Sequence, residues 1–141
     1  MAIEALLDEV ELAIEFPDSG HLGRDLGALL ESVAELLAAP ETGPPLTALL
    51  ADTQHDDALR QLWREQAFGP IRGRYLERVA AAREAGQLPD DIADDEVLDC
   101  VFGPLWFRAL TRPDAMNQAF GHTVARVVFD GLNAREVPQG A

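Results

Sequence analysis

The stretch from Val97 to Leu110 is the feature that most restricts how this chain can fold. Within it only Asp99 and Arg108 carry charge, so that apolar side chains would surround nearly the whole circumference of a helix, which Gly103 and Pro104 interrupt. A helix that packs against one core needs a single apolar stripe and turns its other face to water. We therefore expect this helix to be covered by two different surfaces.

The rest of the sequence also predicts helices. Apolar residues recur at helical spacing in several segments, and no segment alternates convincingly in the manner of a strand. Gly86 suits the left-handed residue just past the end of the longest segment, and Pro70 inside that segment should bend it. We predict one all-α domain of about six helices, at 3–14, 22–37, around 46–50, at 57–85, at 94–111, and from Met116 to beyond Val128.

Charge and composition exclude several classes of function. The 141 residues include 25 acidic and 11 basic side chains, a net charge of −14, so this segment should not bind nucleic acid by itself. No apolar run is long enough to cross a membrane, and the acidic N-terminal stretch does not resemble a signal peptide. A single cysteine, Cys100, fits the reducing cytoplasm, and we expect it to be inert packing in an apolar helix.

Catalytic and metal-binding patterns are weak. The three histidines stand far apart, and there is neither a glycine-rich phosphate loop nor a nucleophile elbow. The segments from His55 to Asp57 and from Asp90 to Glu96 could hold a metal, but capping and dipole stabilisation at a helix start explain both. We expect no cofactor, no metal ion and no enzymatic activity.

Aromatic side chains concentrate on the two helices that proline interrupts. They either fill the core or line a cavity that the bent helices leave open, and the residues alone favour neither reading. In a cavity, Arg72, Tyr75 and Trp106 would supply polar contacts within apolar surroundings.

Three stretches together resemble the C-terminal regulatory domain of the tetracycline-repressor (TetR) family. They are "FPDSGHLGRDLGALL" at 16–30, the segment 46–92 with its "AGQL" break, and "VFGPLWFRALT" at 101–111 with its "GPLWFR" core. The resemblance implies a homodimer formed by the last two helices, at 94–133. It also implies a connecting helix at 1–16 and leaves a loose tail at 134–141.

The family's helix-turn-helix head, which reads operator DNA, is missing from this sequence, and we expect a truncated chain rather than a natural headless regulator. The resemblance implies a ligand-responsive regulator, expected to be a repressor, whose effector is a small apolar or amphipathic molecule. The candidate effector-binding residues are Leu30, Val33, Leu37, Trp63, Phe68, Arg72, Tyr75, Phe102, Trp106 and Phe107. The candidate dimer-interface residues are Val101, Leu105, Phe120, Val124, Val127 and Val128.

The alternative to this hypothesis is a helical module that dimerises or binds another protein and takes no small molecule. The two differ in one observable property, because only the regulator needs an internal cavity.

Overall fold

The computed structural model describes residues 3–134, which form helices and no strand, as the sequence predicts. The tail predicted from 134 onward lies outside the described residues except for Ala134. The elements are α1 (Ile3–Ala13), α2 (Leu22–Ala38), α3 (Gly43–Thr53), α4 (Asp57–Trp63), the π-helical turn η1 (Arg64–Phe68), α5 (Gly69–Glu84), α6 (Asp94–Thr111), the 3₁₀ turn η2 (Pro113–Ala115) and α7 (Gln118–Asn133).

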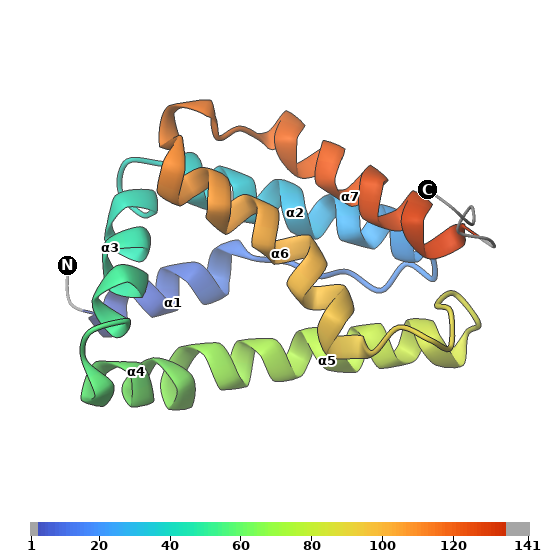
Figure 1. The fold of residues 1–141 in the computed structure, drawn as a ribbon, viewed down its shortest axis with the longest axis horizontal. Helices are drawn as coiled ribbons and strands as arrows, with labels where there is room; N and C mark the ends of the chain where they lie inside the picture. Colours follow the sequence, from blue (N-terminus) through green and yellow to red (C-terminus); the bar gives the residue numbers. More distant parts are fainter. Residues whose placement is uncertain (1–2, 135–141) are drawn as a thin grey trace, which may run out of the picture.

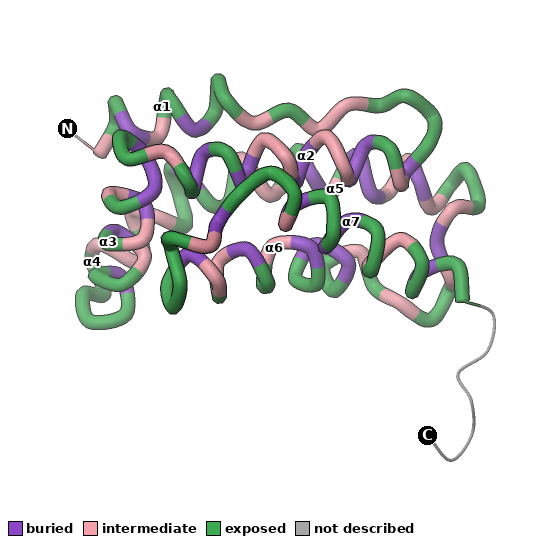
Figure 2. Tube along the Cα trace, turned by 90° about the horizontal axis from the view of Figure 1, so that it is seen from above, coloured by how far each residue is buried: buried purple, intermediate pink, exposed green. Residues whose placement is uncertain are grey.

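Helix α2 is the centre of the packing. It contacts α1, α3, α6 and α7, and its buried face supplies a large share of the core. Figure 1 shows the long α4–η1–α5 helix along one side and α7 along the other, with α6 running obliquely between them. Viewed from above, buried residues line the faces of α2 and α6 that look inward (Figure 2).

Local signals in the sequence fix several helix ends. The side chain of Asp56 accepts a hydrogen bond from the backbone N–H of Leu59 at 3.0 Å and so caps α4. The side chain of Asn117 caps α7 in the same way, by accepting from the backbone N–H of Phe120 at 2.9 Å. Glu96 accepts a hydrogen bond from the backbone N–H of Ala93, 3.0 Å away, at the start of α6. Gly86 has a φ of 76°, which confirms the predicted left-handed residue after α5.

Gly69 and Pro70 explain the π-helical turn between α4 and α5. Pro70 has no N–H to donate and its ring crowds the carbonyl four residues back, which disturbs the α-helical ladder. The N–H of Gly69 bonds instead to the carbonyl of Arg64, five residues earlier. A Cβ on Gly69 would lie only 2.6 Å from that carbonyl oxygen, so the turn requires glycine. The predicted bend is thus realised as a bulge within one long helix.

A buried ion pair ties the first turn of α2 to α5. The carboxylate of Asp25, 0% exposed, accepts hydrogen bonds from Arg78 and from the N–H of Ser19, the latter at 3.0 Å. Arg78 also donates from Nε to the carbonyl of Pro17, 3.0 Å away. Burial raises the pKa of Asp25, but the hydrogen bonds from Arg78 and Ser19 and the charge of Arg78 outweigh it and hold the pKa below its ordinary value. The turn between α1 and α2 is therefore anchored from both sides.

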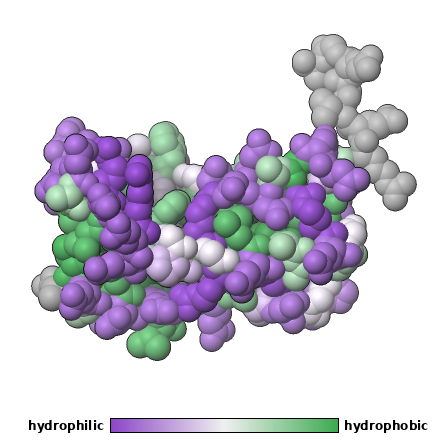
Figure 3. All heavy atoms as spheres, turned by 90° about the horizontal axis from the view of Figure 1, so that it is seen from below, coloured by the Kyte–Doolittle hydropathy of each residue, from purple (hydrophilic) through white to green (hydrophobic). Residues whose placement is uncertain are grey.

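The surface agrees with the acidic composition. Hydrophilic side chains cover most of the face seen in Figure 3, and apolar groups show through in separate patches. No helix of residues 3–134 combines the length and the apolar character needed to span a bilayer. Cys100 is exposed on α6, so the expectation that it packs in the core is wrong.

Candidate functional site

A cavity of about 360 Å³ lies between α1, α2, the α4–η1–α5 helix and α6. Its wall is almost entirely apolar and aromatic, which is typical of a site for a small molecule. The lining residues are Leu7, Val10, Ile14, Val33, Leu36, Leu37, Leu46, Trp63, Ala67, Phe68, Ile71, Arg72, Tyr75, Asp99, Phe102, Gly103 and Trp106.

The two helices that contain an internal proline supply the aromatic part of this wall; the π turn interrupts the α4–η1–α5 helix, whereas α6 continues as one α-helix through Gly103 and Pro104, so the predicted interruption of α6 is wrong. Trp63 and Phe68 lie at either end of the π-helical turn, and Phe102 and Trp106 flank Gly103 and Pro104 on α6. A π turn widens a helix locally and is often found at functional sites. Side chains on both sides of Pro70 and of Pro104 therefore reach the same cavity.

Tyr75 connects the cavity to the core and to the turn after α1. Its ring stacks on Phe102 at a centroid distance of 5.5 Å and meets the edge of Phe16 at 5.8 Å. The guanidinium of Arg78 in turn lies 5.7 Å from the ring of Phe16. Burial raises the pKa of Tyr75 to about 12, although the charge of Arg74 lowers it, so its hydroxyl stays protonated at neutral pH.

Arg72 and Asp99 supply the charged part of the wall. Nη2 of Arg72 donates to the carboxylates of Asp95 and Asp99, at 2.9 and 3.0 Å. The guanidinium also lies 5.3 Å from the ring centroid of Phe68. Most of the surface of both carboxylates is exposed, whereas the Arg72 side chain is largely covered.

The structure brings eight of the ten predicted effector-binding residues to this cavity: Val33, Leu37, Trp63, Phe68, Arg72, Tyr75, Phe102 and Trp106. The other two are corrections. Leu30 is buried in the core and does not line the cavity, whereas Phe107 points outward from α6 and is 67% exposed. At 100° per residue, a one-residue step around α6 separates Trp106 from Phe107.

Sequence reasoning missed the contribution of α1. Leu7, Val10 and Ile14 form one stripe of the first helix and its end, and all three line the cavity. The stripe was visible in the sequence, but a stripe indicates burial without saying whether core or cavity lies opposite. Asp99 was also missed, although it is the one acidic residue within the apolar stretch of α6.

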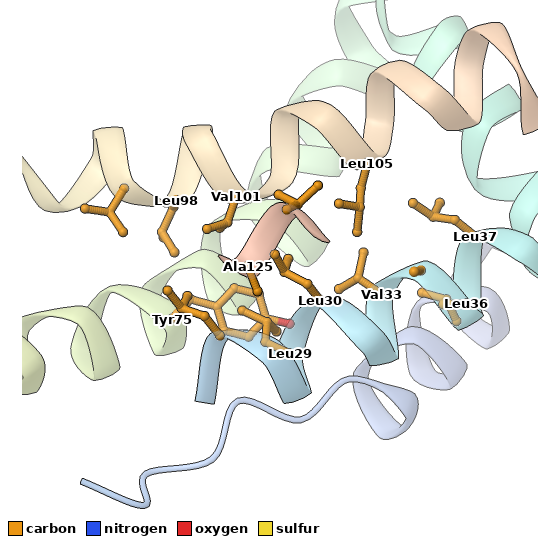
Figure 4. Close-up of a cluster of buried hydrophobic side chains, with 14 of the residues drawn as sticks. Leu29, Leu30, Val33, Leu36, Leu37, Tyr75, Leu98, Val101, Leu105 and Ala125 are labelled. Atoms are coloured by element: carbon orange, nitrogen blue, oxygen red, sulfur yellow. The ribbon is translucent and has the colours of Figure 1, made fainter. Parts of the chain in front are cut away.

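The predicted interface residues divide into two groups. Val101 and Leu105 point from α6 toward α2 in Figure 4, and both are 0% exposed. Val124 is likewise buried in the core. These predicted positions offer little or no surface to a second chain, which corrects the assignment for Val101, Leu105 and Val124. Val127 is exposed, and Phe120 and Val128 are partly buried.

Exposed apolar side chains remain on the last two α-helices. Phe107 and Leu110 of α6 and Val127 of α7 are each at least half exposed. The apolar circumference of α6 thus meets three surroundings: the core, the cavity and the solvent.

Neither suspected metal site gathers ligands in the described part of the chain, where no group of three or more histidine, cysteine or acidic residues is placed to hold an ion. Asp56 caps α4, and Asp94 pairs with Arg83 at 2.7 Å.

Comparison with known proteins agrees with this architecture. The family model described as "Tetracyclin repressor-like, C-terminal domain" matches residues 16–128, and the chain therefore belongs to this family. It is 22% identical over 132 residues to the uncharacterized HTH-type transcriptional regulator YdeS of Bacillus subtilis (strain 168). That match covers 94% of this chain and 66% of YdeS, so the chain spans slightly less than two thirds of this relative's length.

A solved structure gives the same result. The crystal structure of the TetR family transcription regulator SCO0332 superposes with a TM-score of 0.79 and 28% sequence identity, covering 91% of this chain and 70% of that one. The resemblance to the TetR family is thereby confirmed, as is the all-α fold of its C-terminal domain.

Proposed function

We infer that this chain is the effector-binding and dimerisation domain of a ligand-responsive transcriptional regulator that acts as a repressor. A small apolar or amphipathic molecule would enter the cavity, and operator DNA would be bound by helix-turn-helix heads, two per dimer, outside the present sequence. In such a dimer the heads sit about one DNA turn apart, ~34 Å, to meet a palindromic operator.

The observation that carries this proposal is the position of α1 in the cavity wall. Leu7, Val10 and Ile14 would contact a bound molecule directly, and by the family resemblance α1 is the helix that leads to the head. An effector alters DNA binding only if it has different affinities for the two arrangements of the dimer. A ligand that touches α1 can meet this condition, because its contacts change when α1 shifts.

Intrinsic fluorescence tests the proposal with the chain as it is. The sequence holds two tryptophans, Trp63 and Trp106, and both line the cavity. We expect a panel of lipophilic compounds to include some that change this fluorescence saturably and raise the melting temperature. No response across a chemically broad panel would contradict an effector site.

Dimerisation is the second part of the proposal. Its support is the exposed apolar face of Phe107, Leu110 and Val127, which a second copy would cover. With Phe120 and Val128, this face would form a bundle across a two-fold axis. Sedimentation equilibrium should give a dimer, whereas a monomer at high concentration would refute this part.

The exposed face also supports the alternative, a helical interaction module without a small-molecule ligand. That function would follow if the chain dimerises and the cavity takes up nothing.

A further inference from the structure

The charges at the cavity do not balance. One guanidinium, that of Arg72, faces two carboxylates, those of Asp95 and Asp99, so the three groups sum to −1. Asp99 lines the cavity itself, whereas Asp95, in the first turn of α6, does not. The whole chain carries a net charge of −14, which attracts cations toward the surface and repels anions.

Arg72 is already engaged and is a poor receptor for an anionic ligand. Its Nε and Nη2 both donate to Oδ1 of Asp95, at 3.2 and 2.9 Å, and Nη2 also reaches the backbone carbonyl of Asp95 at 3.2 Å. Its guanidinium packs near the ring of Phe68. An anionic ligand would have to displace these contacts, whereas a cationic group can pair with Asp99 while Arg72 remains on Asp95.

The remaining wall also suits a positively charged ligand. The rings of Trp63, Phe68, Phe102 and Trp106 line the same cavity, and aromatic faces attract cations. Tyr75 is 9% exposed and lines the cavity, and no hydrogen bond of its hydroxyl is recorded within residues 3–134. A bound molecule with an ether, carbonyl or hydroxyl oxygen could accept a hydrogen bond from this hydroxyl.

We propose that the effector is an amphipathic cation: an apolar or aromatic body that fills the cavity and an amine or quaternary ammonium group that pairs with Asp99. This inference rests on the proposed function, since it names the ligand class of the same cavity. It separates this domain from one that takes fatty acids or other carboxylates.

A matched set of three probes tests the charge preference. Decyltrimethylammonium, decanol and decanoate share an alkyl body and differ in the charge of the head. Binding to the purified chain is measured by tryptophan fluorescence below the micellar concentration of each probe. An exposed ion pair contributes up to about 1 kcal/mol, so the cation should bind about fivefold more tightly than the alcohol. The anion should bind more weakly than both.

Variants identify the carboxylate. Asp99→Asn removes the charge with little change of shape and should weaken binding of the cation about fivefold relative to binding of decanol. Arg72→Gln removes the opposing positive charge and should strengthen binding of the cation. Asp130→Asn, on α7 and away from the cavity lining, removes the same charge from the chain and is the matched control, which should change nothing.

The results distinguish failure of the proposed ligand class from failure of the proposed function. Tighter binding of decanoate than of the cation, or an Asp99→Asn variant that binds the cation like the parent, overturns the ligand class but leaves the cavity as an effector site. If none of the three probes binds, and the broad lipophilic panel is also silent, the proposed function fails together with this inference.

Discussion

Replacing Arg78 with methionine should leave the buried carboxylate of Asp25 without its charged partner. The Asp25 carboxylate is fully buried, and its Oδ1 has no hydrogen-bond partner within the described residues even with Arg78 present. After Arg78→Met, the N–H of Ser19 is the remaining donor recorded for the carboxylate. Breaking a buried pair by removing one partner costs about 3–5 kcal/mol. That is a large part of the ~5–15 kcal/mol by which a domain is stable.

The stability lost in Arg78→Met should be larger at neutral pH than in acid. In the parent chain the pKa of Asp25 lies below its ordinary value of 3.8, so the pair's stabilisation is present above that value and is lost as the pH falls through the folded-state pKa. In Arg78→Met, burial acts without the opposing charge and raises the pKa of Asp25. The variant then gains stability as the pH falls, because its folded state takes up the proton more readily. The difference between parent and variant should narrow in acid.

Urea denaturation followed by circular dichroism, at neutral and at acidic pH, measures this difference. Adding Asp25→Asn to Arg78→Met removes the stranded charge and should recover much of the stability at neutral pH. A loss below about 1 kcal/mol, or one of equal size at both pH values, would refute the argument that the pair is coupled and desolvated.

Three further variants test other parts of the structure. Gly69→Ala should destabilise the domain by about 1–3 kcal/mol, because its Cβ would meet the Arg64 carbonyl. Gly73→Ala in the same helix, where a Cβ would have nothing within 4 Å, is the control and should stabilise by about 0.5–1 kcal/mol. If thermal unfolding ranked the two variants the other way, the explanation of the π turn would be wrong. Phe107→Glu should raise the dimer dissociation constant about thirtyfold, about 2 kcal/mol, by sedimentation, and an unchanged constant would remove the outer face of α6 from the interface. Trp106→Ala should weaken a bound effector roughly tenfold by calorimetry and leave the dimer intact; loss of folding instead would show that Trp106 is needed for the core.

Much of the cavity wall could be predicted from the sequence because the two helices that contain a proline carry the aromatic residues. A proline and its neighbouring glycine are local signals, since they alter the hydrogen-bond ladder wherever the chain goes. Trp63, Phe68, Phe102 and Trp106 were therefore found from the sequence. Leu7, Val10 and Ile14 could not be assigned to the cavity, because their stripe would look the same facing a packed core.

The assignments on α6 went wrong for a related reason. A helix that is apolar on all sides has no pattern that fixes its rotation about its own axis. Val101 and Leu105 were placed in the interface and Phe107 in the cavity, whereas the first two face α2 and the third faces solvent.

The sequence by itself determined the helices, most of their ends and the all-α class, because side-chain spacing, capping residues and glycine act over a few neighbouring positions. Only the tertiary structure decided which side of α6 meets the core, the cavity or the solvent, and it alone paired Asp25 with Arg78. Those choices depend on the packing of segments distant in the chain, where volume and burial, rather than local pattern, select the arrangement.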